Sequence, residues 1–199
     1  MVTFERANLG ALLRKCHKQL EARLTVEEFK KILAVGHLYR SLYHFTDSAN
    51  LPSIAKHGIL SKQQATEKGI AIAVPGGNEW SRDADVHKGL EDYVSLCFTM
   101  SHPMCHIAHM NGRIPNPRYL AINSDVLKIE GVKITLGVAN KAGTELLNVE
   151  DGLEQLDTEV LYTRTEWDNT DIQVRLQNAE KCEILVPKIV PIALIKRIF

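Results

Sequence analysis

The stretch LYHFTDSANLPSIAKHGIL, residues 42–60, joins a strand pattern to a helix pattern over a short distance. Its first five residues are mostly aromatic or β-branched, and such residues favour a β-strand. Asp47 and Ser48 predict a turn or a helix cap, after which apolar residues recur at helical spacing as far as Gly58. The polar His44 lies inside the strand pattern, which raises the question of what its imidazole contacts.

Downstream of this stretch, the sequence predicts several short strands separated by irregular segments. The candidates are YVSLCFTM (93–100), PRYLAINSDVL (117–127), VKITLGVAN (132–140) and one or two strands within KCEILVPKIVPIALIKRIF (181–199). Residues 61–92 are rich in glycine and polar residues, and VPGGNEWSRD (74–83) is typical of a loop. No glycine-rich dinucleotide motif and no phosphate-binding P-loop motif is present.

Upstream, residues 1 to about 36 have a helical pattern. One apolar stripe is formed by Leu9, Leu12, Leu13, Cys16 and Leu20. Thr25-Val26-Glu27-Glu28 is a capping-box sequence that opens a second helix, and Gly36 is a plausible end for it. Helices at the front followed by short strands indicate the α+β class rather than regular βαβ alternation.

Composition places the chain among ordinary globular proteins, with 45% hydrophobic and 24% charged residues. No apolar run is long enough to span a membrane and the N-terminus lacks a signal-peptide core, so we expect no membrane partner. Four widely spaced cysteines predict a reducing, cytoplasmic location. The formal net charge is zero, which predicts no global attraction to nucleic acid. Residues 145–171 carry nine acidic side chains against one arginine.

The segment SHPMCHIAHM (101–110) offers a possible metal site. Its histidines and cysteine, His102, Cys105, His106 and His109, would share one face of a helix. Imidazole and thiolate suit Zn²⁺, but helical spacing makes such coincidences common. A packed helix with partly exposed histidines is the favoured alternative, and we expect no metal.

Three blocks of sequence, in this order, resemble the DarT family of ADP-ribosyltransferases, which use NAD⁺ to modify bases in single-stranded DNA. YHFTDSANLPSIAKHGIL (43–60) is similar to the family's opening signature. DYVSLCFTMSHPM (92–104) is similar to its second block, although Ser95 to Phe98 and His102 depart from the usual residues. EILVP (183–187) is similar to its last block, a strand led by the catalytic glutamate.

The resemblance implies the ADP-ribosyltransferase fold, with two small facing β-sheets around an NAD⁺ cleft and an N-terminal helical segment. Residues 1–40 would form a helical extension packed on the core, and residues 41–199 the ADP-ribosyltransferase domain. NAD⁺ would be the co-substrate. The implied partners are single-stranded DNA and a DarG-type macrodomain antitoxin, which removes the modification.

The resemblance also implies roles for individual residues. Glu183 would be catalytic, because a fixed carboxylate stabilises the positive charge that develops on the ribose when the nicotinamide bond breaks. Arg82 matches the family's loop arginine before the second block and would be catalytic as well. The residues expected to bind NAD⁺ are His44, Phe45, Thr46, Asn50, Leu51 and Tyr93. Those expected to meet the nucleic acid are Gln173, Arg175, Gln177 and Trp167. Trp167 and Tyr162 are candidates for stacking on a base, and packing in the core is an equal alternative for each of them.

Two alternatives stay open at this point. The neutral charge and the acidic 145–171 segment favour an acceptor in RNA or protein over DNA. A catalytically inactive interaction module of the same fold is the second alternative, in which His44 and Glu183 are ordinary surface residues.

Overall fold

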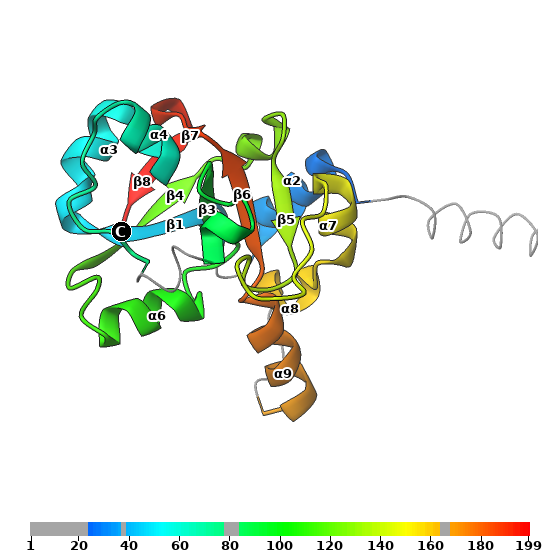
Figure 1. The fold of residues 1–199 in the computed structure, drawn as a ribbon. Helices are drawn as coiled ribbons and strands as arrows, with labels where there is room; N and C mark the ends of the chain where they lie inside the picture. Colours follow the sequence, from blue (N-terminus) through cyan, green and yellow to red (C-terminus); the bar gives the residue numbers. More distant parts are fainter. Residues whose placement is uncertain (1–23, 37–38, 78–83, 164–167) are drawn as a thin grey trace, which may run out of the picture.

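The structure is a computed structural model that describes residues 24–36, 39–77, 84–163 and 168–199 (Figure 1). Its main β-sheet has six strands in the order β5-β6-β3-β1-β4-β8, and a second sheet pairs β2 with β7. Every strand pair is antiparallel. The α+β class predicted from the sequence is confirmed. The two sheets are unequal, however, since one of them is a two-stranded ribbon.

The strands are β1 (Leu42–Asp47), β2 (Ile59–Leu60), β3 (Tyr93–Cys97), β4 (Pro117–Ile122), β5 (Lys133–Thr135), β6 (Glu183–Pro187), β7 (Ile189–Val190) and β8 (Ile195–Ile198). All predicted strand segments contain a strand. The last segment contains three strands instead of one or two, because Lys188 has a positive φ of 63° and turns the chain between β6 and β7.

The α-helices are α2 (Val26–Val35), α3 (Leu51–His57), α4 (Lys62–Glu67), α6 (Pro103–Met110), α7 (Val149–Gln155), α8 (Thr158–Tyr162) and α9 (Thr170–Ala179). Short 3₁₀ helices are η1 (Ser48–Asn50), η2 (Ser124–Lys128) and η3 (Ile192–Leu194). Among the described residues, no helix is long and apolar enough to cross a membrane.

The capping box predicted for α2 is confirmed. The Thr25 hydroxyl accepts from the Glu28 N–H at 3.3 Å, and the Thr25 N–H donates to the Glu28 carboxylate at 2.9 Å. Phe29 and Leu33 are buried, and the helix ends at Gly36 as predicted. The apolar stripe predicted earlier in the chain lies outside the described residues.

One face of the main sheet carries the apolar core. Alternate residues of β3 and β6, such as Leu96 and Ile184, are fully buried with side chains of α2, α7 and α8. Gly152 allows α7 to approach β5 closely, because a Cβ at that position would lie 2.4 Å from the Cβ of Ile134. Since side chains alternate along a strand, Ser95 and Glu183 belong to the opposite face, where the cavity described below lies.

Several helices lie in the segments between the predicted strands, which are predicted from the sequence to be irregular. The helix α4 and the helices α7 to α9 are short, and each begins with a side-chain cap, at Ser61, Asn148, Asp157 and Asn169 respectively. Helices of 5 to 10 residues have little room for an amphipathic stripe, so periodicity does not reveal them. In Figure 1, α9 projects away from the body of the molecule.

Candidate active site

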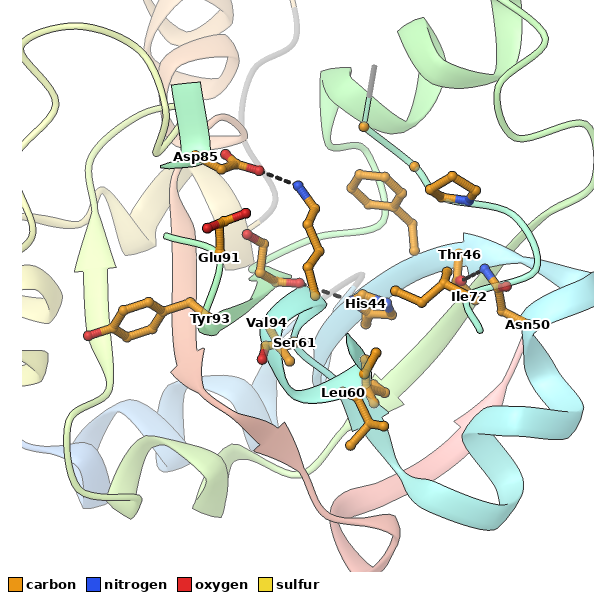
Figure 2. Close-up of a pocket in the computed structure, with 18 of the residues that line it drawn as sticks. His44, Thr46, Asn50, Leu60, Ser61, Ile72, Asp85, Glu91, Tyr93 and Val94 are labelled. Atoms are coloured by element: carbon orange, nitrogen blue, oxygen red, sulfur yellow. Dashed lines mark hydrogen bonds and ion pairs between the residues drawn. The ribbon is translucent and has the colours of Figure 1, made fainter. Parts of the chain in front are cut away.

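A cavity of about 730 Å³ lies between the main sheet and the small sheet (Figure 2). Its walls come from β1, β3, the start of β6, the α4 region, the 70–77 loop and residues 138–140. This volume falls within the range of pockets that hold cofactors and other small ligands. Segments far apart in the sequence therefore meet around one space.

His44 lies where two neighbouring strands separate. β1 pairs with β4 along its whole length but with β3 at a single position, Tyr43 opposite Cys97. Beyond that pair, the His44 Nδ1 donates to the Ser95 carbonyl of β3 at 2.9 Å. The imidazole thus bridges the gap with a side-chain hydrogen bond, which explains a polar residue within this strand.

The environment of His44 keeps its ring neutral. Burial lowers its pKa, an effect partly offset by the hydrogen bond to Ser95. Because the Ser95 carbonyl can only accept, the proton resides on Nδ1 and Nε2 is left as an acceptor. His44 lines the cavity, so this acceptor is available to a ligand.

Asn50, the last residue of η1, connects the 70–77 loop to the end of β1. Its Nδ2 donates to the Thr46 hydroxyl at 3.0 Å and to the Val74 carbonyl at 2.8 Å. Its Oδ1 accepts from the Val74 N–H at 3.0 Å. Asn50 is 7% exposed, and its amide thereby fixes one wall of the cavity (Figure 2).

Glu183 is a buried carboxyl group at the first position of β6, and it lines the same cavity. Burial raises its pKa to about 7, which Asp85 reinforces, while hydrogen bonds from the Ala139 N–H and the Ser95 hydroxyl act in the opposite direction. The Ala139 N–H lies 3.3 Å from Oε1. A carboxyl group poised near neutrality is suited to proton transfer or to stabilising charge.

The segment that carries Ala139 is held by a lysine. The Lys88 ammonium group donates to the carbonyls of Ala139 at 2.9 Å and Thr144 at 3.2 Å, and to that of Lys141. Three acceptors on one ammonium group fix the 138–144 loop against the chain that follows the helical turn 84–87. The loop in turn presents the Ala139 N–H to Glu183.

Charged residues that sequence reasoning missed also line the cavity. Lys62 of α4 forms an ion pair with Asp85, marked by a dashed line in Figure 2. The Arg113 Nη1 donates to the Gly76 carbonyl at 2.5 Å. These residues stand in segments without a recognisable motif, and only the folded chain brings them to the cavity.

The structure gathers six of the twelve predicted site residues around the cavity. Those that line the cavity are His44, Phe45, Thr46, Asn50, Tyr93 and Glu183. Leu51 packs against the apolar core and is not among the lining residues. Arg82 and Trp167 lie outside the described residues.

The residues predicted to meet nucleic acid lie elsewhere. Gln173, Arg175 and Gln177 belong to α9 and do not line the cavity. The Arg175 guanidinium donates to Asp157 at 2.7 and 2.9 Å and to Glu159 at 2.6 Å. For Tyr162 the structure selects the core-packing alternative over base stacking, because this side chain is 3% exposed and packs edge-on against Phe29.

The residues of the possible metal site, His102, Cys105, His106 and His109, do not share one face of a helix, because His102 precedes the helix. Residues 103–110 do form a helix, but His102 is its buried N-cap and Cys105 is buried as well. His109 bonds with the Ile114 carbonyl at 3.0 Å. Within the part of the chain that the structure describes, no group of three or more His, Cys, Asp or Glu side chains could hold a metal ion.

A family model described as ssDNA thymidine ADP-ribosyltransferase, DarT, matches residues 43–199. Among solved structures, Thermus sp. 2.9 DarT in complex with ADP-ribosylated ssDNA is similar with a TM-score of 0.62 and 19% identity, covering 82% of this chain and 83% of that chain. The structure of the same protein in complex with NAD⁺ is similar with a TM-score of 0.53 and 22% identity, and the match covers 79% of each chain.

Thermosipho africanus DarTG in complex with ADP-ribose is similar with a TM-score of 0.61 and 22% identity. The match covers 80% of this chain but only 43% of the Thermosipho chain, so this chain spans less than half of that relative. A search of curated proteins found no match. The structural similarities show a shared fold.

Proposed function

This chain belongs to the DarT family of ssDNA thymidine ADP-ribosyltransferases, and from that premise we propose that it transfers ADP-ribose from NAD⁺ to a thymidine base in single-stranded DNA. The observation that carries the proposal is the buried Glu183, which lines a cavity of cofactor size together with His44. A related DarT is known with NAD⁺ and with ADP-ribosylated ssDNA, which supports the choice of both substrates.

Glu183 would act on the ribose. The bond between the ribose C1′ and the nicotinamide nitrogen breaks, and nicotinamide leaves with the electron pair. The carboxylate stabilises the positive charge on the ribose while a base nitrogen attacks C1′. That nitrogen loses its proton, and a carboxyl group with a pKa of about 7 can accept it near neutral pH.

The remaining cavity residues would hold the dinucleotide. His44 offers its Nε2 acceptor, and Phe45, Thr46, Asn50 and Tyr93 shape the walls. Among the described lining residues the permanent cations are Lys62 and Arg113, and Lys62 already pairs with Asp85. Arg113 donates a hydrogen bond to an uncharged carbonyl, which makes it the better candidate of the two for binding the phosphates.

The proposal extends to partners and location. The Thermosipho relative is a DarTG protein in complex with ADP-ribose, which supports a DarG-type macrodomain antitoxin as the partner of this chain in a toxin–antitoxin or phage-defence system.

The family match begins at residue 43, which supports a domain boundary near residue 40. Cys97, Cys105 and Cys182 are free and buried, in keeping with the reducing cytoplasm.

The test is incubation with NAD⁺ and a mixed-sequence single-stranded oligonucleotide, read by intact mass, with Glu183→Ala as the control. We expect a mass gain of one ADP-ribose unit that needs both thymidine in the oligonucleotide and the native Glu183. No gain on any oligonucleotide, with NAD⁺ binding intact, would reject DNA as the acceptor.

One feature of the structure favours a protein acceptor, because RNA carries the same phosphate charges as DNA. The α7–α9 region is acidic, and the Arg175 guanidinium is already bound by Asp157 and Glu159. Phosphates approaching this surface would be repelled. Labelled NAD⁺ followed by separate nuclease and protease digestion distinguishes RNA and protein acceptors from DNA.

A further inference from the structure

We propose that His102 is a positioning residue for Glu183, holding the carboxylate in place through its Nε2–H. The proposal rests on the function proposed above and deepens it. The Nε2 of His102 lies 3.7 Å from the Glu183 Oε1, and both side chains line the cavity. No sequence motif indicates this pair, because His102 stands where the resemblance predicts a different kind of residue.

The cap of α6 determines which nitrogen of His102 carries the proton. The Met104 N–H donates to the His102 Nδ1 at 3.3 Å, so Nδ1 must be unprotonated. The proton of the neutral ring is therefore on Nε2, the nitrogen nearest to Glu183. One imidazole thus accepts from a helix N-terminus and presents a donor to the carboxylate.

The Nε2–H of His102 needs an acceptor. His102 is 2% exposed, its ring stacks on Phe45 at 6.0 Å, and Nε2 makes no hydrogen bond of ordinary length within the described residues. A buried donor without an acceptor costs free energy. The Oε1 of Glu183 is 0.5–1 Å beyond ordinary hydrogen-bond length, and catalytic contacts of this kind commonly shorten when substrate binds.

The groups around Glu183 other than His102 include Asp85, two buried thiols, Ser95 and Ala139, and each acts on the carboxyl group in a different way. Asp85 raises the pKa of Glu183 by repulsion, and the thiols of Cys97 and Cys182 have their own pKa values raised by burial, so they stay uncharged. Ser95 and Ala139 donate hydrogen bonds from other directions. Burial lowers the pKa of His102 to about 4, so this ring is neutral in the working pH range.

A neutral donor has a chemical advantage at this position. It favours the ionised form of Glu183, which the reaction needs, without adding a positive charge beside the cationic nicotinamide ring. The competing explanation is that His102 only caps α6 and meets the nearby Lys181 carbonyl, which also raises the pKa of its ring.

Two substitutions separate these explanations. His102→Asn keeps an acceptor near the Nδ1 position and remains a good N-cap, but its side chain is too short to reach Glu183. His102→Gln keeps an N–H near the Nε2 position and weakens the cap. We expect His102→Asn to lower kcat at neutral pH about tenfold and to move the acidic limb of the pH profile up by about one unit, with little change in KM. We expect His102→Gln to retain most of the activity and the wild-type limb.

The result that overturns the proposal is the reverse pattern, with His102→Asn normal and His102→Gln impaired. A second readout does not depend on activity: NMR titration of ¹³C-carboxyl glutamate, with Glu183 assigned from the Glu183→Gln spectrum. The pKa of Glu183 should rise in His102→Asn and not in His102→Gln. An unchanged pKa of Glu183 in both variants rejects the positioning role. If the wild type transfers no ADP-ribose, the proposed function fails, while the titration still decides the His102–Glu183 contact.

Discussion

At the scale of single residues, the ionisation of Glu183 lowers the stability of the folded protein. Its pKa in the folded chain is raised from 4.5 to about 7, chiefly by burial. The folded state therefore binds a proton more tightly than the unfolded state. The resulting stabilisation is complete below pH 4.5 and is lost as the pH rises through 7.

The consequence for a variant can be measured. Glu183→Gln removes the ionisation, so we expect it to be more stable than the native protein at pH 8 by up to about 3 kcal/mol, and no more stable at pH 4.5. Urea unfolding at the two pH values measures this difference. A stabilisation of equal size at both would contradict the pKa as its cause.

A second residue-scale prediction concerns Asn50. Asn50→Asp keeps the acceptor for the Val74 N–H but places an oxygen against the Val74 carbonyl, where the Nδ2 now donates at 2.8 Å. We expect a loss of about 2–3 kcal/mol in unfolding free energy and weaker NAD⁺ binding, because the 70–77 loop lines the cavity.

The matched control is Asn169→Asp, the same change at the exposed N-cap of α9. Aspartate caps helices as well as asparagine does, so we expect a change below about 0.5 kcal/mol. Chemical denaturation and NAD⁺ calorimetry on both variants provide the comparison. Equal effects at the two positions would remove the role assigned to Asn50.

Residues of the site differed in how far the sequence could reveal them. His44 and Glu183 are polar residues inside strand patterns, which is a visible anomaly, and both line the cavity. Arg113 and His102 flank α6 and line the cavity because of how the chain folds around that helix. No local sequence pattern predicts that these two residues line the cavity. Leu51 has a helical, apolar pattern that suits the core equally well, and it packs there.

At the scale of elements, the contact between α7 and β5 depends on Gly152. Gly152→Ala should raise the helix propensity of α7 by about 1 kcal/mol, yet its Cβ would lie 2.4 Å from the Cβ of Ile134 and 2.7 Å from its Cγ2. We expect a net loss of about 2 kcal/mol or more, measured as a fall in the denaturation midpoint.

Gly137→Ala is the control for that prediction. A Cβ at Gly137 would meet only the Thr144 hydroxyl, at 4.0 Å, and the φ of Gly137 is not positive. We expect a change within about 0.5 kcal/mol of zero. A Gly152→Ala variant as stable as this control would show that α7 can move away from β5 at no cost.

The second element-scale prediction concerns the 138–144 loop. Lys88→Met removes the ammonium group that holds three loop carbonyls, so the Ala139 N–H should no longer be fixed against Glu183. We expect kcat to fall roughly tenfold with a smaller change in KM. Lys141→Met, at an exposed position in the same loop, should leave both constants unchanged, and an equal loss in the two variants would argue against the clamp.

Helices and strands also differed in how well they could be predicted. The strand segments were recognisable because aromatic and β-branched residues cluster in them, and α2 because its capping box is local. The helices α7 to α9 are short, acidic and held by tertiary contacts and caps, so local sequence favours a loop. Arg175 shows the consequence: the sequence presents a free cation, but the fold pairs it with two carboxylates.

At the scale of the whole molecule, the charge balance limits how the protein can bind a polyanion. The formal net charge is zero, and the region around α7–α9 is acidic. We expect affinity for single-stranded DNA to fall with salt at a shallow slope, about −2 or less in magnitude on logarithmic axes, which corresponds to about three phosphates. Fluorescence anisotropy between 50 and 300 mM salt measures that slope.

Arg175 provides an internal check on this prediction. Its guanidinium group is already paired with Asp157 and Glu159, so Arg175→Ala should leave the slope unchanged. A slope reduced in magnitude by about 0.7 would show instead that Arg175 contacts a phosphate, as the sequence alone predicted.

The position of β6 in the sheet has a consequence for biosynthesis. This strand lies between β5 and β3 and carries Glu183, yet it follows every other wall of the cavity in the chain. During translation the earlier strands leave the ribosome first, and the sheet lacks an interior strand until β6 inserts. The growing polypeptide therefore carries the cavity-lining histidine, His44, long before it carries the carboxylate. Until residue 183 has been made and β6 has paired with both of its neighbours, the cavity has its other walls but not the Glu183 carboxylate.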